Sequence, residues 1–309
     1  MECAGLRLDA SLAQVFPEHS RSRLQDWLKQ GVILIDGAHL TGKSKVMGGE
    51  RIDFSTAVSV ASDATHAMSA TALALAAEDI PLTVVFEDDQ LLVIDKPAGL
   101  VVHPGNGNGS GTLMNALLYH APQLAEIPRA GIVHRLDKET GGLLVVAKTL
   151  IAQTDLVRQL QARTVKRQYL ALALGVVSRS STIDAPMGRH PVHRTKMAVV
   201  REGSPGSKDA RTHYVIRERF AKSTLLECQL ETGRTHQIRV HLASIGHPLA
   251  GDPAYGKTCS GDPRLDAFKR QALHAWRLAL VHPVSDLDME WESPIPEDFS
   301  SLLDELRNT

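Results

Sequence analysis

Short strand-like runs separated by turn signals dominate the chain beyond residue 80, and this pattern constrains the fold most. The runs lie at 82–87, 91–95, 143–148, 167–177, 212–219, 223–231, 273–282 and 287–292. Helical patterns lie between and after them, at 112–120, 150–162, 235–245 and 297–307. Strands joined mostly by turns pair as antiparallel neighbours, whereas a regular alternation of strand and helix would indicate a parallel sheet. We therefore expect an α+β fold with a mixed, largely antiparallel sheet.

The first 60 residues show a different pattern. Two amphipathic helices and two short strands are expected there, at 7–16, 20–30, 32–37 and 51–54. The segment that follows is rich in Ala, Ser and Thr and has no aromatic side chain, which favours a linker over a packed element. The sequence thus predicts a small α/β domain, a linker and a large domain, over 1–60, 61–79 and 80–309.

Positive charge is concentrated in one part of a nearly neutral chain. Residues 131–241 hold 19 Lys or Arg against 9 Asp or Glu, and the segments on either side are net acidic. Such a concentration is typical of a surface that meets phosphates, although a solvated strand surface would show it too. No run approaches the roughly 18 to 20 apolar residues of a membrane span, and three scattered cysteines suit a reducing compartment. We expect a cytoplasmic protein that does not enter a membrane.

Two glycine-rich segments imitate nucleotide-binding motifs. GAHLTGKS (37–44) matches the phosphate-loop pattern, but the glycines of the following KVMGGE oppose the helix that the motif requires. HPGNGNGSGT (103–112) lacks the last glycine of G-x-G-x-x-G, and either a flexible turn or a phosphate contact fits it. Among the 14 histidines, His236 and His241 would point about 140° apart on a helix, which is no metal-ligand spacing. We expect neither a nucleotide cofactor nor a metal.

The segment GIVHRLDKETGGLLVVAKT (131–149) carries the clearest chemical signal. Asp137 stands between a polar loop and an apolar strand, next to His134, Arg135 and Lys138. Nearby cations favour the ionised form of a carboxylate, which a nucleophile or a base requires. A turn-capping aspartate would produce the same local pattern, so this segment alone leaves both interpretations open.

Three separated motifs together resemble the RluA-type pseudouridine synthases. They are HRLDKETGG, KRQYLALALG (166–175) and ETGRTHQIRVHLASIGHPLAGDPAYG (231–256), and residues 7–54 resemble the S4 RNA-binding module that many of these enzymes carry. RSRLQDWL, RHPVHRTKMAV and RQALHAWRLALVHPVSDLDMEW are most similar to members that modify large-subunit (23S) ribosomal RNA. The resemblance implies the pseudouridine synthase fold and a cofactor-free, monomeric isomerase whose partner is ribosomal RNA. A non-catalytic RNA-binding or ribosome-assembly factor, or a synthase for transfer RNA or another ribosomal site, remains the alternative.

The resemblance also implies roles for particular residues. Asp137 corresponds to the essential aspartate, and Tyr169 to a ring that packs on the uracil near its C5 proton. Arg234 is expected to pair with the catalytic carboxylate, and Arg135 to enter the space that the flipped nucleotide leaves. The expected RNA contacts are His134, Arg135, Arg21, Arg23, Lys43 and Lys45.

The chemistry of this isomerisation is consistent with those residue types. The bond from N1 to C1′ breaks and the same base is reattached through C5, so the atoms balance without a redox agent, a metal or a triphosphate. The target base must leave its stack, at a cost of a few kcal/mol. A glycoside hydrolase is the nearest rival, but it normally uses two carboxylates. Glu139 is the only close second carboxylate, and along an extended chain it would point away from Asp137.

Overall fold

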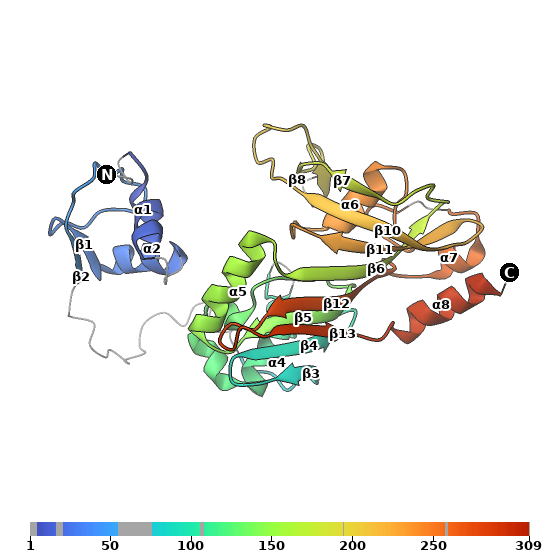
Figure 1. Ribbon diagram of the computed structural model, residues 1–309, viewed down its shortest axis with the longest axis horizontal. Helices are drawn as coiled ribbons and strands as arrows, with labels where there is room; N and C mark the ends of the chain where they lie inside the picture. The colour runs from blue at the N-terminus through green and yellow to red at the C-terminus, as the bar shows by residue number, and fades with distance from the viewer. Residues whose placement is uncertain are drawn as a thin grey trace. The chain divides into compact units, whose positions relative to one another are not determined.

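The computed structural model describes residues 5–16, 21–54, 76–105, 108–193, 195–256 and 259–308. Its contacts divide the chain into two compact units, residues 1–69 and 70–309 (Figure 1). Most of the expected linker lies outside the described residues. None of the described helices is long and apolar enough to cross a membrane.

The N-terminal unit packs two helices against a two-stranded antiparallel sheet. Its elements are α1 (Leu8–Val15), α2 (Arg21–Gln30), β1 (Ile33–Ile35) and β2 (Ile52–Phe54). Both helices and β1 contribute to one core, in which Leu12, Leu24 and Ile33 are at most 1% exposed. No helix follows the sequence GAHLTGKS, which forms turns and isolated bridges. The helix that a phosphate loop would require does not begin at Lys43 and Ser44.

The larger unit is built on a sheet whose described strands follow the order β3-β4-β5-β12-β6-β11-β10-β7, with β13 paired to β12. Neighbouring strands are antiparallel except β5 and β12, which are parallel. The strands are β3 (Thr83–Glu87), β4 (Leu91–Lys96), β5 (Gly141–Ala147), β6 (Lys166–Leu174), β7 (Ser181–Asp184), β10 (Arg211–Arg219), β11 (Ser223–Leu230), β12 (Leu273–Val281) and β13 (Asp288–Glu292). A separate ribbon pairs β8 (Met187–Arg189) with β9 (Met197–Val199). The expected α+β fold with a mixed, largely antiparallel sheet is confirmed.

The helices of this unit are α4 (Leu113–His120), α5 (Leu150–Ala162), α6 (Gln237–Ser244), α7 (Pro263–Ala267) and α8 (Glu297–Arg307), with 3-10 turns η1 (Pro122–Glu126) and η2 (Pro128–Gly131). Side chains cap the first turn of α4, α5 and α7 among them. The Thr149 hydroxyl accepts a hydrogen bond from the N–H of Ala152 at 3.1 Å, which fixes the start of α5. That helix ends where Arg163 adopts the left-handed conformation.

Alternation along β6 separates two cores. Tyr169 and Ala171 enter the core that contains α4 and α6, whereas Leu170 and Leu172 enter the core that contains α8. Tyr169 therefore lies on the face of the sheet that α4 and α6 cover.

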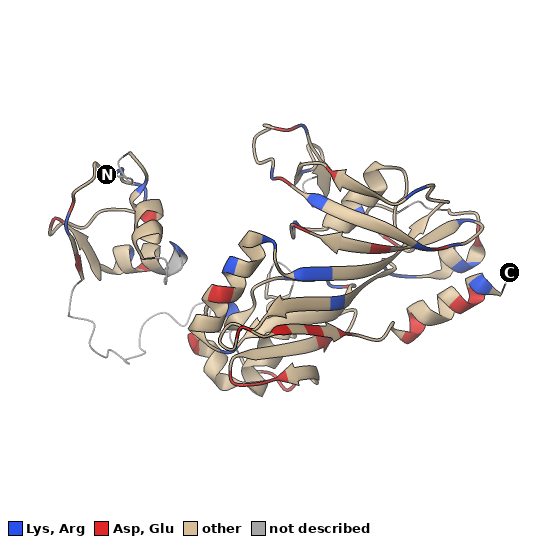
Figure 2. Ribbon diagram, in the orientation of Figure 1, with Lys and Arg blue, Asp and Glu red and all other residues tan. Residues whose placement is uncertain are grey.

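Charge is distributed unevenly over the larger unit. β6 carries basic segments, and β13 and α8 carry mostly acidic ones (Figure 2).

Candidate active site

A cleft of about 330 Å³ lies where the loop before β5, the start of β6 and the segment leading into α6 come together. Asp137, Tyr169 and Arg234, one from each of the three motifs, all line it. Basic side chains also line the cleft, namely His103, Arg129, His134, Arg135, Arg167, His236 and Arg239. The fold thus gathers residues that are far apart in the sequence.

Asp137 is held at the start of a tight turn. The N–H of Thr140 donates to the Asp137 carbonyl at 3.0 Å, and β5 begins at the next residue. Gly142 then passes so close to β12 that an added Cβ would lie 2.2 Å from the carbonyl oxygen of Ala275. The Asp137 side chain keeps 15% of its surface exposed. Turn and strand together present the carboxylate to the cleft.

Arg239 is the cation that pairs with this carboxylate. Its Nη1 donates to Oδ2 of Asp137 at 2.9 Å. On the other side, Nε and Nη2 donate to the two carboxylate oxygens of Asp252 at 2.7 and 2.9 Å. Burial alone would lower the pKa of Arg239, but the bonds and charges of Asp252 and Asp137 outweigh it and raise that pKa above its ordinary value. Arg239 is therefore a permanent positive charge between two acids.

The expected pairing of Arg234 with Asp137 is wrong. The Nε of Arg234 donates instead to the carbonyl of Asp209 at 2.9 Å. The physical reason is the position of α6, which begins at Gln237. Arg239 lies in the first turn of this helix, whereas Arg234 lies in the turn before it. The sequence contained a signal that favours Arg239 over Arg234, because Arg239, the second arginine of RTHQIR, falls inside the expected helix.

Asp252 was not singled out from the sequence, although it lies in the quoted motif. Its carboxylate is fully buried and accepts hydrogen bonds from the N–H groups of Ala254 and Tyr255 at 2.8 and 3.0 Å. Burial raises the pKa of Asp252, but the hydrogen bonds and charge of Arg239, together with the N–H groups of Tyr255 and Ala254, outweigh burial and lower that pKa below its ordinary value. The ionised carboxylate fixes Arg239 in one orientation, because the two side chains form parallel hydrogen bonds.

His236 approaches Asp137 from the other side. Its Nε2 lies 3.8 Å from Oδ1 of Asp137, and its Nδ1 lies 2.8 Å from the hydroxyl of Tyr255. That hydroxyl accepts a hydrogen bond from the N–H of Met197 at 2.9 Å, so its own proton is available to Nδ1. Burial lowers the pKa of His236, which favours a neutral ring. The ring therefore adds a second polar group beside the carboxylate.

Tyr169 forms the apolar wall of the site. Its side chain is 6% exposed, and its backbone pairs with Cys228 and Ala275 on the two neighbouring strands. Burial raises the pKa of the hydroxyl, so the phenol keeps its proton. A ring held by two strands is suited to pack on a planar base.

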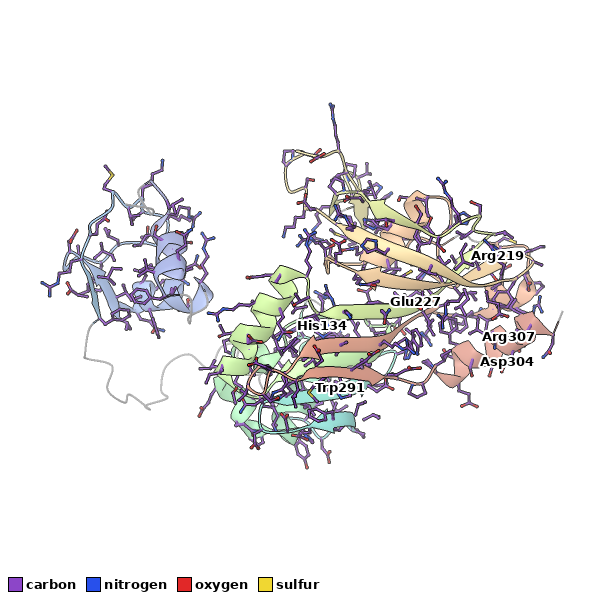
Figure 3. The ribbon with its side chains drawn as sticks, viewed as in Figure 1. His134, Arg219, Glu227, Trp291, Asp304 and Arg307 are labelled. Carbon is purple, nitrogen blue, oxygen red and sulfur yellow. The ribbon has the colours of Figure 1, made fainter. Side chains whose placement is uncertain are left out.

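The side chain of His134, labelled in Figure 3, contacts the backbone of β5. Its Nε2 accepts a hydrogen bond from the N–H of Val145 at 3.1 Å, and its Nδ1 is enclosed without a hydrogen-bond partner. Burial lowers its pKa to about 3, so the ring is neutral. The contact of His134 with RNA stays a prediction, because the half-buried ring lines the cleft while its Nε2 is engaged by the backbone of β5. The side chain also supports β5.

The remaining expected RNA contacts differ in availability. Arg135 is exposed at the cleft, and Lys43 and Lys45 are exposed on the N-terminal unit. Arg21 donates to the buried carboxylate of Asp9 at 2.8 Å, so part of its charge is used within its own unit. The side chain of Arg23, the fourth expected contact on the N-terminal unit, is outside the part of the chain that the structure describes.

The antiparallel α+β fold and the comparisons with known proteins place the chain in one class of RNA-modifying enzymes. Residues 90–244 match the family model described as RNA pseudouridylate synthase, and the chain belongs to that family. It is 60% identical to the Ribosomal large subunit pseudouridine synthase D of Nitrosomonas europaea, over 99% of this chain and 86% of the relative.

Two further comparisons agree with the family. A protein of the same description from Xanthomonas campestris pv. campestris is 52% identical, over 98% of this chain and 90% of the relative. The solved structure of Human RNA Pseudouridylate Synthase Domain Containing 1 superposes with a TM-score of 0.55 at 28% identity, over 74% of this chain and 96% of that one.

Proposed function

We propose that the protein converts specific uridines of large-subunit ribosomal RNA to pseudouridine, with Asp137 as the catalytic residue. The observation that carries the proposal is the carboxylate of Asp137 in the cleft, 2.9 Å from Arg239 and in the same cleft as Tyr169. The names of the two relatives support large-subunit ribosomal RNA as the target. The positive charge of residues 131–241 supports an RNA partner.

The chain's own groups account for each requirement of the reaction. The ionised Asp137 acts on the ribose of a flipped-out uridine, either by attacking C1′ or by removing a sugar proton. Tyr169 packs on the detached uracil while it turns. The base then joins C1′ through C5, loses the C5 proton and gains a proton at N1, so substrate and product have the same atoms. Arg239 keeps Asp137 oriented and compensates its charge throughout.

The N-terminal unit adds a second contact with RNA in this proposal. Its two helices and small sheet resemble an S4 module, and Lys43 and Lys45 offer exposed charge for phosphates. In this proposal the protein acts in the cytoplasm as a monomer.

Release of tritium from [5-³H]uridine-labelled 23S ribosomal RNA tests the proposal, because the C5 proton is lost when pseudouridine forms. The wild-type protein should release label, and Asp137→Asn should not. Equal release by both proteins would remove Asp137 from the mechanism. Binding without release by the wild-type protein would indicate an RNA-binding assembly factor, and free uracil would indicate a hydrolase. Release of tritium from labelled transfer RNA and not from ribosomal RNA would identify the protein as a synthase for transfer RNA.

A further inference from the structure

Arg129 and Ala130 form a left-handed turn at the edge of the catalytic cleft. Their φ angles are 57° and 50°, and Gly131 follows with a φ of 74°. Residues with a Cβ seldom adopt this region, because the Cβ approaches a carbonyl oxygen, and two in succession are rarer still. Such strain persists only where the surrounding structure holds it, and it gathers at functional sites.

The surrounding structure does hold this turn. Gln153 on α5 donates to the carbonyl of Pro128 at 2.7 Å. Ala130 is 2% exposed, and Gly131 lies so close to β5 that an added Cβ would stand 1.9 Å from a backbone oxygen. The backbone of Arg129 is therefore fixed relative to the sheet that carries the active site.

The side chain of Arg129 is an uncompensated cation. It is exposed and lines the cleft together with Arg135 and His103. Neither arginine has an ion pair with a carboxylate in the part of the chain that the structure describes. Burial, with the charges of Arg135 and Arg129, lowers the pKa of His103 to about 4, so this ring is neutral and adds no charge. Asp137 cannot compensate the cations, because it is already paired with Arg239.

An anion of the substrate would match this position. A base reaches an enclosed pocket by rotation about its own backbone, which leaves the adjoining phosphates at the entrance. A guanidinium group forms paired hydrogen bonds with phosphate oxygens. Arg129 is exposed at the cleft, whereas Tyr169 is buried within it. A rigid, uncompensated arginine at this place has the chemistry of a phosphate-binding group.

We propose that Arg129, held by the left-handed turn, binds a phosphodiester group of the RNA strand next to the flipped-out uridine. The inference rests on the proposed function, because it takes a uridine in RNA as the substrate. It assigns to Arg129 a contact that positions the strand and takes no part in bond making or breaking.

The substitution Arg129→Asn tests the contact without disturbing the turn. Asparagine tolerates the left-handed region better than most residues, so the backbone is kept while the cation is removed. Single-turnover tritium release from [5-³H]uridine-labelled 23S ribosomal RNA is measured against protein concentration at several NaCl concentrations. The half-saturating concentration should rise about 3- to 10-fold at low salt, and the slope of log affinity against log salt should fall by about 0.7. The rate at saturation should stay within about twofold of the wild-type value.

Two further variants complete the test. Arg129→Lys should keep the salt slope, since it keeps the charge, but raise the half-saturating concentration by losing the paired hydrogen bonds. Arg179→Asn is the matched control, because Arg179 is exposed and does not line the cleft. Thermal unfolding of each variant shows whether the fold is kept.

The outcomes separate this inference from the proposed function. A wild-type protein that releases no tritium overturns the proposed function and, with it, the inference. An active wild type together with an Arg129→Asn variant of unchanged half-saturation and salt slope overturns the inference alone. A rate lost at saturation with an unchanged slope also overturns it, because Arg129 would then act on the chemistry or the fold rather than on a phosphate.

Discussion

The guanidinium of Arg239 bridges Asp137 and Asp252, with a 2.9 Å hydrogen bond to the first and two bonds to the second. Arg239 and Asp137 are 102 residues apart in the chain. The pair therefore exists only in the folded protein, where α6 brings the arginine to the turn before β5. Asp252 holds the arginine, and the arginine holds the catalytic carboxylate.

Arg239→Gln should lower the rate at saturating RNA by about 100-fold or more, because it leaves two acids without their shared cation. Arg234→Gln is the matched comparison from the same segment and should lower that rate less than about fivefold, since Arg234 does not contact Asp137. Single-turnover tritium release measures both. Arg239→Lys should restore part of the rate, because it keeps a positive charge beside Asp137. A greater loss of this rate in Arg234→Gln than in Arg239→Gln would mean that Arg234, and not Arg239, pairs with the catalytic carboxylate.

Tyr169→Phe separates stacking from proton transfer. Within the described residues no hydrogen bond engages the Tyr169 hydroxyl, so we expect the free energy of unfolding to change by less than about 1 kcal/mol. RNA binding should be kept, because the ring remains. Turnover should slow if the hydroxyl takes part in moving the C5 proton, and a filter-binding assay beside tritium release distinguishes the two effects. Unchanged turnover would limit Tyr169 to stacking.

Much of the fold could be predicted because its signals are local. Helix periodicity and strand alternation placed the expected elements near α5, β6 and the hairpin of β10 and β11, where each segment has its own apolar pattern. The strands β7, β8 and β9 were missed. They have three or four residues each, too few for an alternation to show. β7 forms by pairing with β10, and β8 and β9 pair with each other.

The site was predicted less completely than the fold. Asp137 and Tyr169 were identified by motif, and the structure brings them to one cleft. The choice between the two arginines of one motif followed the resemblance to the family, although the expected helix 235–245 already contained Arg239 and not Arg234. Asp252 and Arg129 gave no separate signal, because a buried ion pair and a left-handed turn are properties of tertiary packing.

Lys96→Met should destabilise the catalytic unit and release the turn that carries Asp137. Lys96 is 1% exposed, and its three N–H groups donate to the carbonyls of Pro97, Leu100 and Lys138 at 2.8, 2.9 and 3.0 Å. Methionine fills a similar volume but leaves three buried acceptors without donors, so we expect a loss of about 3 kcal/mol in the free energy of unfolding.

Chemical denaturation measures the loss of stability in Lys96→Met, and tritium release at a temperature where the variant is folded measures its effect on activity. The exposed Lys269, changed to Met, is the control and should unfold like the wild type. Equal stability of Lys96→Met and the wild type would mean that the three carbonyls find other donors.

Acid should destabilise the protein partly through His134. The pKa of its ring is lowered by burial from 6.5 to about 3 in the folded protein. Between these values the unfolded chain binds a proton that the folded chain does not, so stability falls as the pH falls, by up to about 1.4 kcal/mol per pH unit. From pH 7 to pH 5 the contribution of this residue to the free energy of unfolding is about 2 kcal/mol.

The variant His134→Gln can still accept the hydrogen bond from Val145 but does not titrate, and its free energy of unfolding should fall by about 2 kcal/mol less than that of the wild type over this interval. Denaturation at the two pH values measures the difference between the proteins, which cancels the other titrating groups. The exposed His193, changed to Gln, should show the wild-type dependence, and the same dependence in His134→Gln would mean that the ring takes up its proton without unfolding.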